Sequence, residues 1–144
     1  MNEDTKRKFL VGIEAVQAEA HKNAKDKGFW APYEKVEKMA LALLVAGGSG
    51  VGIAGQRDLK EAILSQKIAL MHEELSELLG ALRSGNPTAP CKKVPVINAM
   101  EEEAADLLIR LVDFCGEVGI RLGVATLLKM EYNAGRPQMH GKRF

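Results

Sequence analysis

The chain has 144 residues, of which 47% are hydrophobic and 27% are charged, and its formal net charge is +1. These values predict one globular domain spanning residues 1–144 and belonging to the soluble class. A net charge near zero argues against a nucleic-acid partner, because proteins that bind nucleic acids present a positively charged surface. The aromatic content of 5% argues against a platform for base stacking.

The first two elements are predicted to be helices. Phe9, Ile13, Val16 and Ala20 recur at helical spacing, and Gly28 can end the helix that they define. Residues 28–32 read as a connection, and apolar positions at helical spacing resume over 33–46. Next comes a glycine-rich segment, residues 47–56, which we expect to be a flexible loop.

The rest of the chain is also predicted to be helical. The stripe from Leu64 to Leu82 is the strongest signal in the sequence. The expected helices cover residues 4–27, 33–46, 57–83, 99–117 and 120–134, with a proline-containing loop over 84–98 and a basic tail over 135–144. No stretch alternates as a strand does, so the expected fold is all-α, a four- to five-helix bundle.

Two short acidic motifs carry the main functional signal. Glu74 and Glu77 lie three residues apart on one predicted helix, and Glu103 and Asp106 do so on the next. Each pair occupies one face of its helix, beside the apolar stripe rather than opposite it, so the two pairs can meet at a helix–helix boundary. Four converging carboxylates repel one another, and a hard divalent cation with oxygen ligands, Mg²⁺ or alternatively Mn²⁺, relieves that repulsion. Surface glutamates on good helix formers are the alternative interpretation.

Other site classes fit less well. A di-iron bundle needs Glu-x-x-His motifs, and the sequence contains none. Residues 50–55 match Gly-x-Gly-x-x-Gly, but a dinucleotide site needs that motif between a strand and a helix. The longest uncharged run, residues 39–55, is broken by glycines and too short to span a membrane. With two cysteines outside any metal motif and no secretory segment, we expect a reduced, cytoplasmic location.

The two acidic motifs together resemble the Glu-Glu-x-x-Glu and Glu-x-x-Asp signature of MazG-like, all-α nucleoside triphosphate pyrophosphohydrolases. Residues 129–136 are similar to the Lys-x-x-x-Asn-x-x-Arg element of that family, and residues 136–144 are similar to the tail of one of its branches. The resemblance covers residues 65–144 well and the first third loosely. Residues 36–64 look like additional length before the first acidic motif.

The resemblance implies Mg²⁺-dependent hydrolysis of a (deoxy)nucleoside triphosphate to the monophosphate and pyrophosphate, in a nucleotide-pool house-cleaning role. It implies a homodimer or homotetramer. Its residue assignments are metal ligation by Glu74, Glu77, Glu103 and Asp106, an additional ligand or water-orienting base at Glu73, and nucleotide binding by Lys129, Asn133 and Arg136.

Three more residues are candidates for substrate binding. Trp30 is either a core anchor or a surface on which the substrate base stacks. His140 and Lys142 belong either to a solvated terminus or to a basic tail that reaches the triphosphate. Two alternatives to the proposed activity stay open, a phosphoribosyl-ATP pyrophosphohydrolase-like enzyme and a helical interaction module without catalytic activity.

Overall fold

The computed structural model describes residues 1–47 and 50–137. Over these residues the chain forms five helices and no strand, apart from one isolated bridge between Pro90 and Asn98. The helices are α1 (Glu3–Asp26), α2 (Ala31–Val45), α3 (Gly50–Arg83), α4 (Ala99–Val118) and α5 (Leu122–Ala134). The all-α class is therefore confirmed, and four of the five helices begin and end within two residues of the prediction.

Local chemistry explains the helix ends. The Asn2 side chain caps α1 by accepting from the backbone N–H of Thr5 at 2.8 Å. A full capping box starts α4, where Asn98 and Glu101 each accept from the other's backbone N–H. Gly119 ends α4 in the left-handed region, with φ of 72°.

The loop predicted over residues 47–56 is wrong from residue 50 onward. α3 begins at Gly50 and continues without a break for 34 residues. Gly52 lies against α2, where a Cβ would be in ordinary contact, 3.6 Å, with a Leu43 methyl group. Packing of α3 against α2 supports the helix despite the low helix propensity of glycine, because tertiary packing supplies most helical stability.

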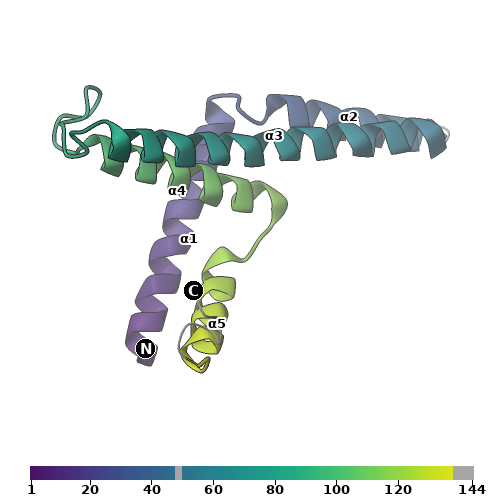
Figure 1. Cartoon of the computed structure of the whole chain (residues 1–144). Coiled ribbons are helices and arrows are strands. Elements are labelled where there is room, and N and C mark those ends of the chain that lie inside the picture. Colours follow the sequence, from purple (N-terminus) through teal and green to yellow (C-terminus); the bar gives the residue numbers. More distant parts are fainter. Residues whose placement is uncertain (48–49, 138–144) are drawn as a thin grey trace.

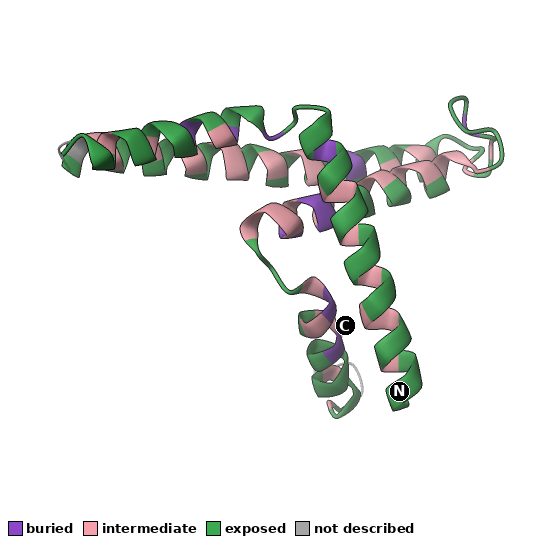
Figure 2. Ribbon diagram, turned by 180° about the vertical axis from the view of Figure 1, so that it is seen from behind, coloured by how far each residue is buried: buried purple, intermediate pink, exposed green. Residues whose placement is uncertain are grey.

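α3 is the longest helix, and the others are arranged around it (Figure 1). α2 runs antiparallel beside its first half and α4 beside its second half, while α1 and α5 lie side by side and point away from α3. Figure 2 shows that buried residues gather where α1 crosses the α3–α4 pair. Ala24, Trp30 and Tyr33 form the buried core there, packed against Ile63, Leu64 and Phe114. Over the described residues, no helix combines the length and apolar character required to cross a membrane.

Candidate metal centre

The α3–α4 contact brings the two acidic motifs together. Glu74 of α3 and Glu103 and Asp106 of α4 each offer a carboxylate oxygen, and these oxygens lie within 4.8 Å of one another. Glu74 is buried, with an exposed fraction of 4%, and the other two are half-buried. α3 and α4 are antiparallel neighbours, so the acidic motif of one helix faces that of the other. Glu77, the fourth predicted ligand, is exposed and is not among these three residues.

Glu77 extends this cluster. Its side chain is exposed, and its carboxylate is close enough to Glu103 to affect the titration of that residue. Burial, followed by the neighbouring Glu77 carboxylate and the charges of Glu102 and Glu74, raises the pKa of Glu103 to about 7. We call Glu74, Glu77, Glu103 and Asp106 the acidic cluster. Its geometry makes full ionisation unfavourable without an additional cation.

One protein cation contacts the acidic cluster directly. The Arg110 Nε of α4 donates to Glu74 Oε1 at 2.5 Å. Within the part of the chain that the structure describes, this one guanidinium stands against four carboxylates and leaves an excess of negative charge. The donor set consists only of carboxylate oxygens, which suits Mg²⁺ or Mn²⁺ and not a metal that favours imidazole or thiolate. The residues therefore fit a hard divalent cation.

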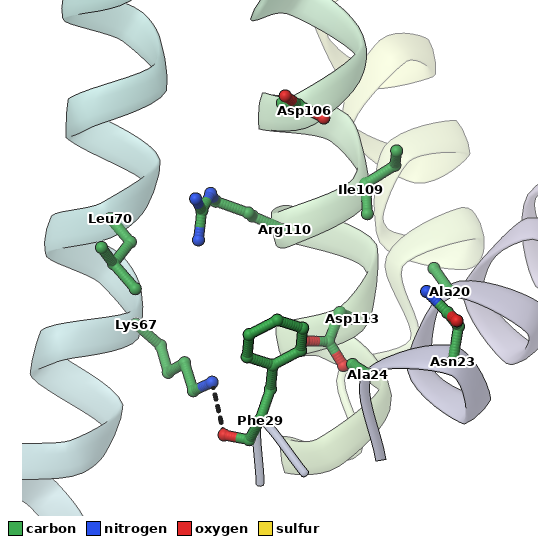
Figure 3. Close-up of a pocket in the computed structure, with 10 residues that line it drawn as sticks. All are labelled: Ala20, Asn23, Ala24, Phe29, Lys67, Leu70, Asp106, Ile109, Arg110 and Asp113. Atoms are coloured by element: carbon green, nitrogen blue, oxygen red, sulfur yellow. Dashed lines mark hydrogen bonds between the residues drawn. The ribbon is translucent and has the colours of Figure 1, made fainter. Parts of the chain in front are cut away.

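A cavity of about 270 Å³ adjoins the acidic cluster between α1, α3 and α4 (Figure 3). Its walls are mainly apolar, and its charged lining residues are Lys67, Asp106, Arg110 and Asp113. Asp106 belongs to both the cavity and the acidic cluster. In Figure 3 the side chains of Arg110 and Lys67 extend between α3 and α4. The cavity thus combines an acidic end with two cations.

Lys67 is held close to the aromatic residues that follow α1. Its Nζ donates to the backbone carbonyl of Phe29 at 2.8 Å and lies 4.5 Å from the centroid of the Trp30 ring. Burial lowers the pKa of Lys67, and the nearby Asp113 carboxylate opposes that effect. An ammonium group that has lost much of its hydration binds an incoming anion more strongly than an exposed one.

The far end of the cavity contains a second carboxylate site that the sequence analysis did not identify. Asp113 Oδ1 accepts from Trp30 Nε1 at 2.7 Å and lies 2.9 Å from His21 Nδ1. His21 Nε2 lies 3.3 Å from Glu117, and a Cβ on Gly116 would come within 2.8 Å of the His21 ring. Arg110 and Asp113 fall on the same predicted helical stripe as Glu103 and Asp106. This shared stripe was the sequence signal that could have identified Asp113 as a site residue. The pairing with His21 spans 92 positions and leaves no local pattern.

Several predicted site residues lie outside this arrangement. Glu73 is exposed and is not among the three converging carboxylates. Lys129 and Arg136 both approach the Tyr132 ring, at 4.7 Å and 5.8 Å from its centroid. They and Asn133 belong to α5 and the residues just after it, and α5 packs against α1, away from the α3–α4 contact (Figure 1).

Trp30 is the clearest correction among the substrate-binding candidates. Its side chain is fully buried and hydrogen-bonded to Asp113, so it is a core anchor and offers no free face to a substrate base in this structure. His140 and Lys142 lie outside the described residues.

Comparison with known proteins adds no relative. No family model matches the chain, and no curated protein or solved structure matches it. The functional argument therefore rests on the acidic cluster, its adjoining cavity and the sequence motifs.

Proposed function

We propose that this protein hydrolyses (deoxy)nucleoside triphosphates to the monophosphate and pyrophosphate with Mg²⁺. The observation that carries the proposal is the convergence of Glu74, Glu103 and Asp106 within 4.8 Å, next to a cavity lined by Lys67 and Arg110. Carboxylates alone would support a structural cation site. Cations beside them add the means to bind the polyphosphate that accompanies Mg²⁺ in phosphoryl chemistry.

The side chains divide the chemistry between them. The acidic cluster would hold the metal, which when bound lowers the pKa of a coordinated water and neutralises phosphate charge. Arg110 can grip phosphate oxygens through two parallel N–H donors, and Lys67 supplies a point charge. Arg110, which contacts Glu74, stabilises the negative charge that develops on pyrophosphate as it leaves. We assign Glu77 to orienting the attacking water, with Glu73 as the alternative; both side chains are exposed.

An oligomer is part of the proposal. Ile68, Leu75, Leu79 and Leu82 are exposed along one side of α3, an apolar surface of the kind that marks an interface. We infer a homodimer or homotetramer, in which Lys129, Asn133 and Arg136 would serve the nucleotide of a second copy. Light scattering at micromolar concentration should give a mass of at least two chains, and a monomer would contradict the inference.

Pyrophosphate release tests the activity. The purified protein is incubated with each deoxynucleoside and ribonucleoside triphosphate and with phosphoribosyl-ATP, in Mg²⁺ and in EDTA. We expect release of pyrophosphate from nucleoside triphosphates in the Mg²⁺ samples and none in the EDTA samples. Release from phosphoribosyl-ATP only would favour that narrower enzyme, and release from none of them would favour the interaction module. The proposed house-cleaning role in the cytoplasm requires the first result.

A further inference from the structure

We propose that the cavity beside the acidic cluster holds the nucleobase and that Asp113 selects bases carrying an exocyclic amino group. The inference rests on the proposed function, because it assumes that a nucleotide places its phosphates at the acidic cluster. It adds a specificity residue that neither the acidic motifs nor the resemblance assigns.

The spacing along α4 supports this placement. Asp106, Arg110 and Asp113 all line the cavity and are separated by four and then three positions, so they follow one face of the helix. At 1.5 Å per residue, Arg110 lies about 6 Å and Asp113 about 10 Å along the axis from Asp106. A nucleotide with its phosphates at Asp106 and Arg110 therefore extends its base toward Asp113.

The cavity walls favour a base over a sugar at that end. Phe29, Leu70 and Ile109 contribute apolar surface, and Ala20 and Ala24 keep the α1 side small. A flat, largely apolar ring system is buried favourably by such walls. A sugar would need several polar partners. The volume of about 270 Å³ leaves room for a base and ordered water.

The two carboxylate oxygens of Asp113 differ in their hydrogen bonding within the protein. Trp30 Nε1 and His21 Nδ1 both approach Oδ1, at 2.7 Å and 2.9 Å. Within the described residues, no hydrogen bond reaches Oδ2. Asp113 as a whole is 9% exposed. Its Oδ2 is not among the buried polar atoms of the described chain that lack a partner, so this oxygen retains solvent access and can accept from a ligand that supplies a donor.

An exocyclic amino group is such a donor. The amino group of a cytosine base would donate to Oδ2, whereas uracil has a carbonyl oxygen at the same ring position. That oxygen would face the carboxylate with no hydrogen between them, so uracil is rejected by repulsion as well as by the lost bond. Adenine and guanine also carry amino groups, so the selection acts against uracil and thymine.

Binding of two matched analogues tests the assignment. The α,β-methylene analogues of dCTP and dUTP differ only in the base and resist cleavage between the α and β phosphorus atoms. Titration calorimetry in Mg²⁺ should give at least about tenfold tighter binding of the dCTP analogue, the scale expected for a hydrogen bond to a buried charge. Equal affinities, or a tighter dUTP analogue, would overturn the inference.

Asp113→Asn sharpens the test because the amide has a defined orientation. Trp30 Nε1 donates to Oδ1 and requires an acceptor there, so the amide oxygen takes that position and the amide NH₂ takes the place of Oδ2. The new donor faces the base, and the preference should reverse toward the dUTP analogue. An unchanged preference for the dCTP analogue would count against Asp113. Far-UV circular dichroism confirms that the variant is folded.

Ala20→Leu provides an independent variant that does not disturb Asp113. The larger side chain fills part of the cavity and should weaken both analogues at least about tenfold. Mn²⁺ affinity at the acidic cluster, measured by electron paramagnetic resonance, should not change. Unchanged nucleotide affinity would place the base elsewhere, and so would a preference that follows ribose against deoxyribose instead of the base.

The inference and the proposed function can fail separately. Pyrophosphate release with equal affinity for the two analogues would refute the role of Asp113 and leave the activity standing. Selective analogue binding that reverses in Asp113→Asn, without pyrophosphate release from any nucleotide, would support the base site and refute the enzyme.

Discussion

The two ends of the cavity both present carboxylates, but their surroundings differ. At one end, Glu74, Glu103 and Asp106 crowd together, and over residues 1–47 and 50–137 the cation that contacts them is Arg110, through Glu74. At the other end, Asp113 has an indole N–H and an imidazole within hydrogen-bond distance. The three carboxylates at the first end carry more negative charge than Arg110 neutralises. At the second end, Oδ1 of Asp113 has two protein groups within hydrogen-bond distance.

This difference separates stability from function. A buried carboxylate with protein donors contributes to the native fold, and removing a donor leaves it unsatisfied. Crowded carboxylates oppose folding unless a ligand neutralises them, so a fold that retains them gains from that ligand. Substitutions in the acidic cluster should therefore reduce activity, and substitutions around Asp113 should reduce stability.

The largest expected effect is on turnover in Glu74→Gln. The amide keeps the shape of the side chain but loses a charged metal ligand, so pyrophosphate release should fall at least about 100-fold, or ~2.7 kcal/mol in activation free energy. Helix content by circular dichroism should not change. Glu61→Gln, an exposed position on the same helix, is the matched control and should retain activity. Loss of folding in Glu74→Gln would show that Glu74 is structural and would break the comparison.

Trp30→Phe should act at the other end, on stability. Phenylalanine keeps most of the buried aromatic surface but cannot donate to Asp113, so the free energy of unfolding should fall by about 2 kcal/mol in urea denaturation. Phe29→Leu alters the neighbouring, exposed ring and should cost less than about 0.5 kcal/mol. Equal losses in the two variants would mean that the Trp30–Asp113 bond does not stabilise the fold.

The smallest expected effect is a pH dependence of stability in metal-free protein. The pKa of Glu103 is about 7 in the folded chain against an ordinary value of 4.5. Between these values the folded state binds more protons than the unfolded state, so the free energy of unfolding decreases as pH rises from about 5 to 7. Urea denaturation in EDTA should show that decrease, and Mg²⁺ should oppose it at pH 7.

Glu103→Gln is the control for this pH dependence. The amide does not titrate, so the decrease between pH 5 and 7 should become smaller in the variant. The same slope in both proteins would assign the effect to another group and would weaken the contrast between the two ends.

Much of the fold and of the acidic cluster could be predicted because their signals are local. Apolar spacing and end signals such as Gly28 and Gly119 define the helices, and residues three apart on one helix must share a face. The start of α3 could not be found in this way, because glycine composition alone predicts a loop. Its helical state accompanies packing against the neighbouring helix α2, which a local composition signal does not reveal.

The second carboxylate site was hidden for a related reason. His21, Trp30 and Asp113 meet only after α1 crosses α4, and their separations of 83 and 92 positions carry no periodic signal. Trp30 illustrates the limit: its residue type fits either a core or a stacking surface, and only its burial decides between them. Lys67 and Arg110 could have been singled out from the acidic stripes that they share.

The continuity of α4 constrains how this protein can vary. Asp106 and Asp113 lie seven positions apart on an unbroken helix, so they differ by only about 20° in direction. Inserting or deleting one residue between them would rotate one carboxylate by about 100° relative to the other. Natural variants that preserve both ends should therefore accept substitutions in this segment of α4 and exclude changes in its length.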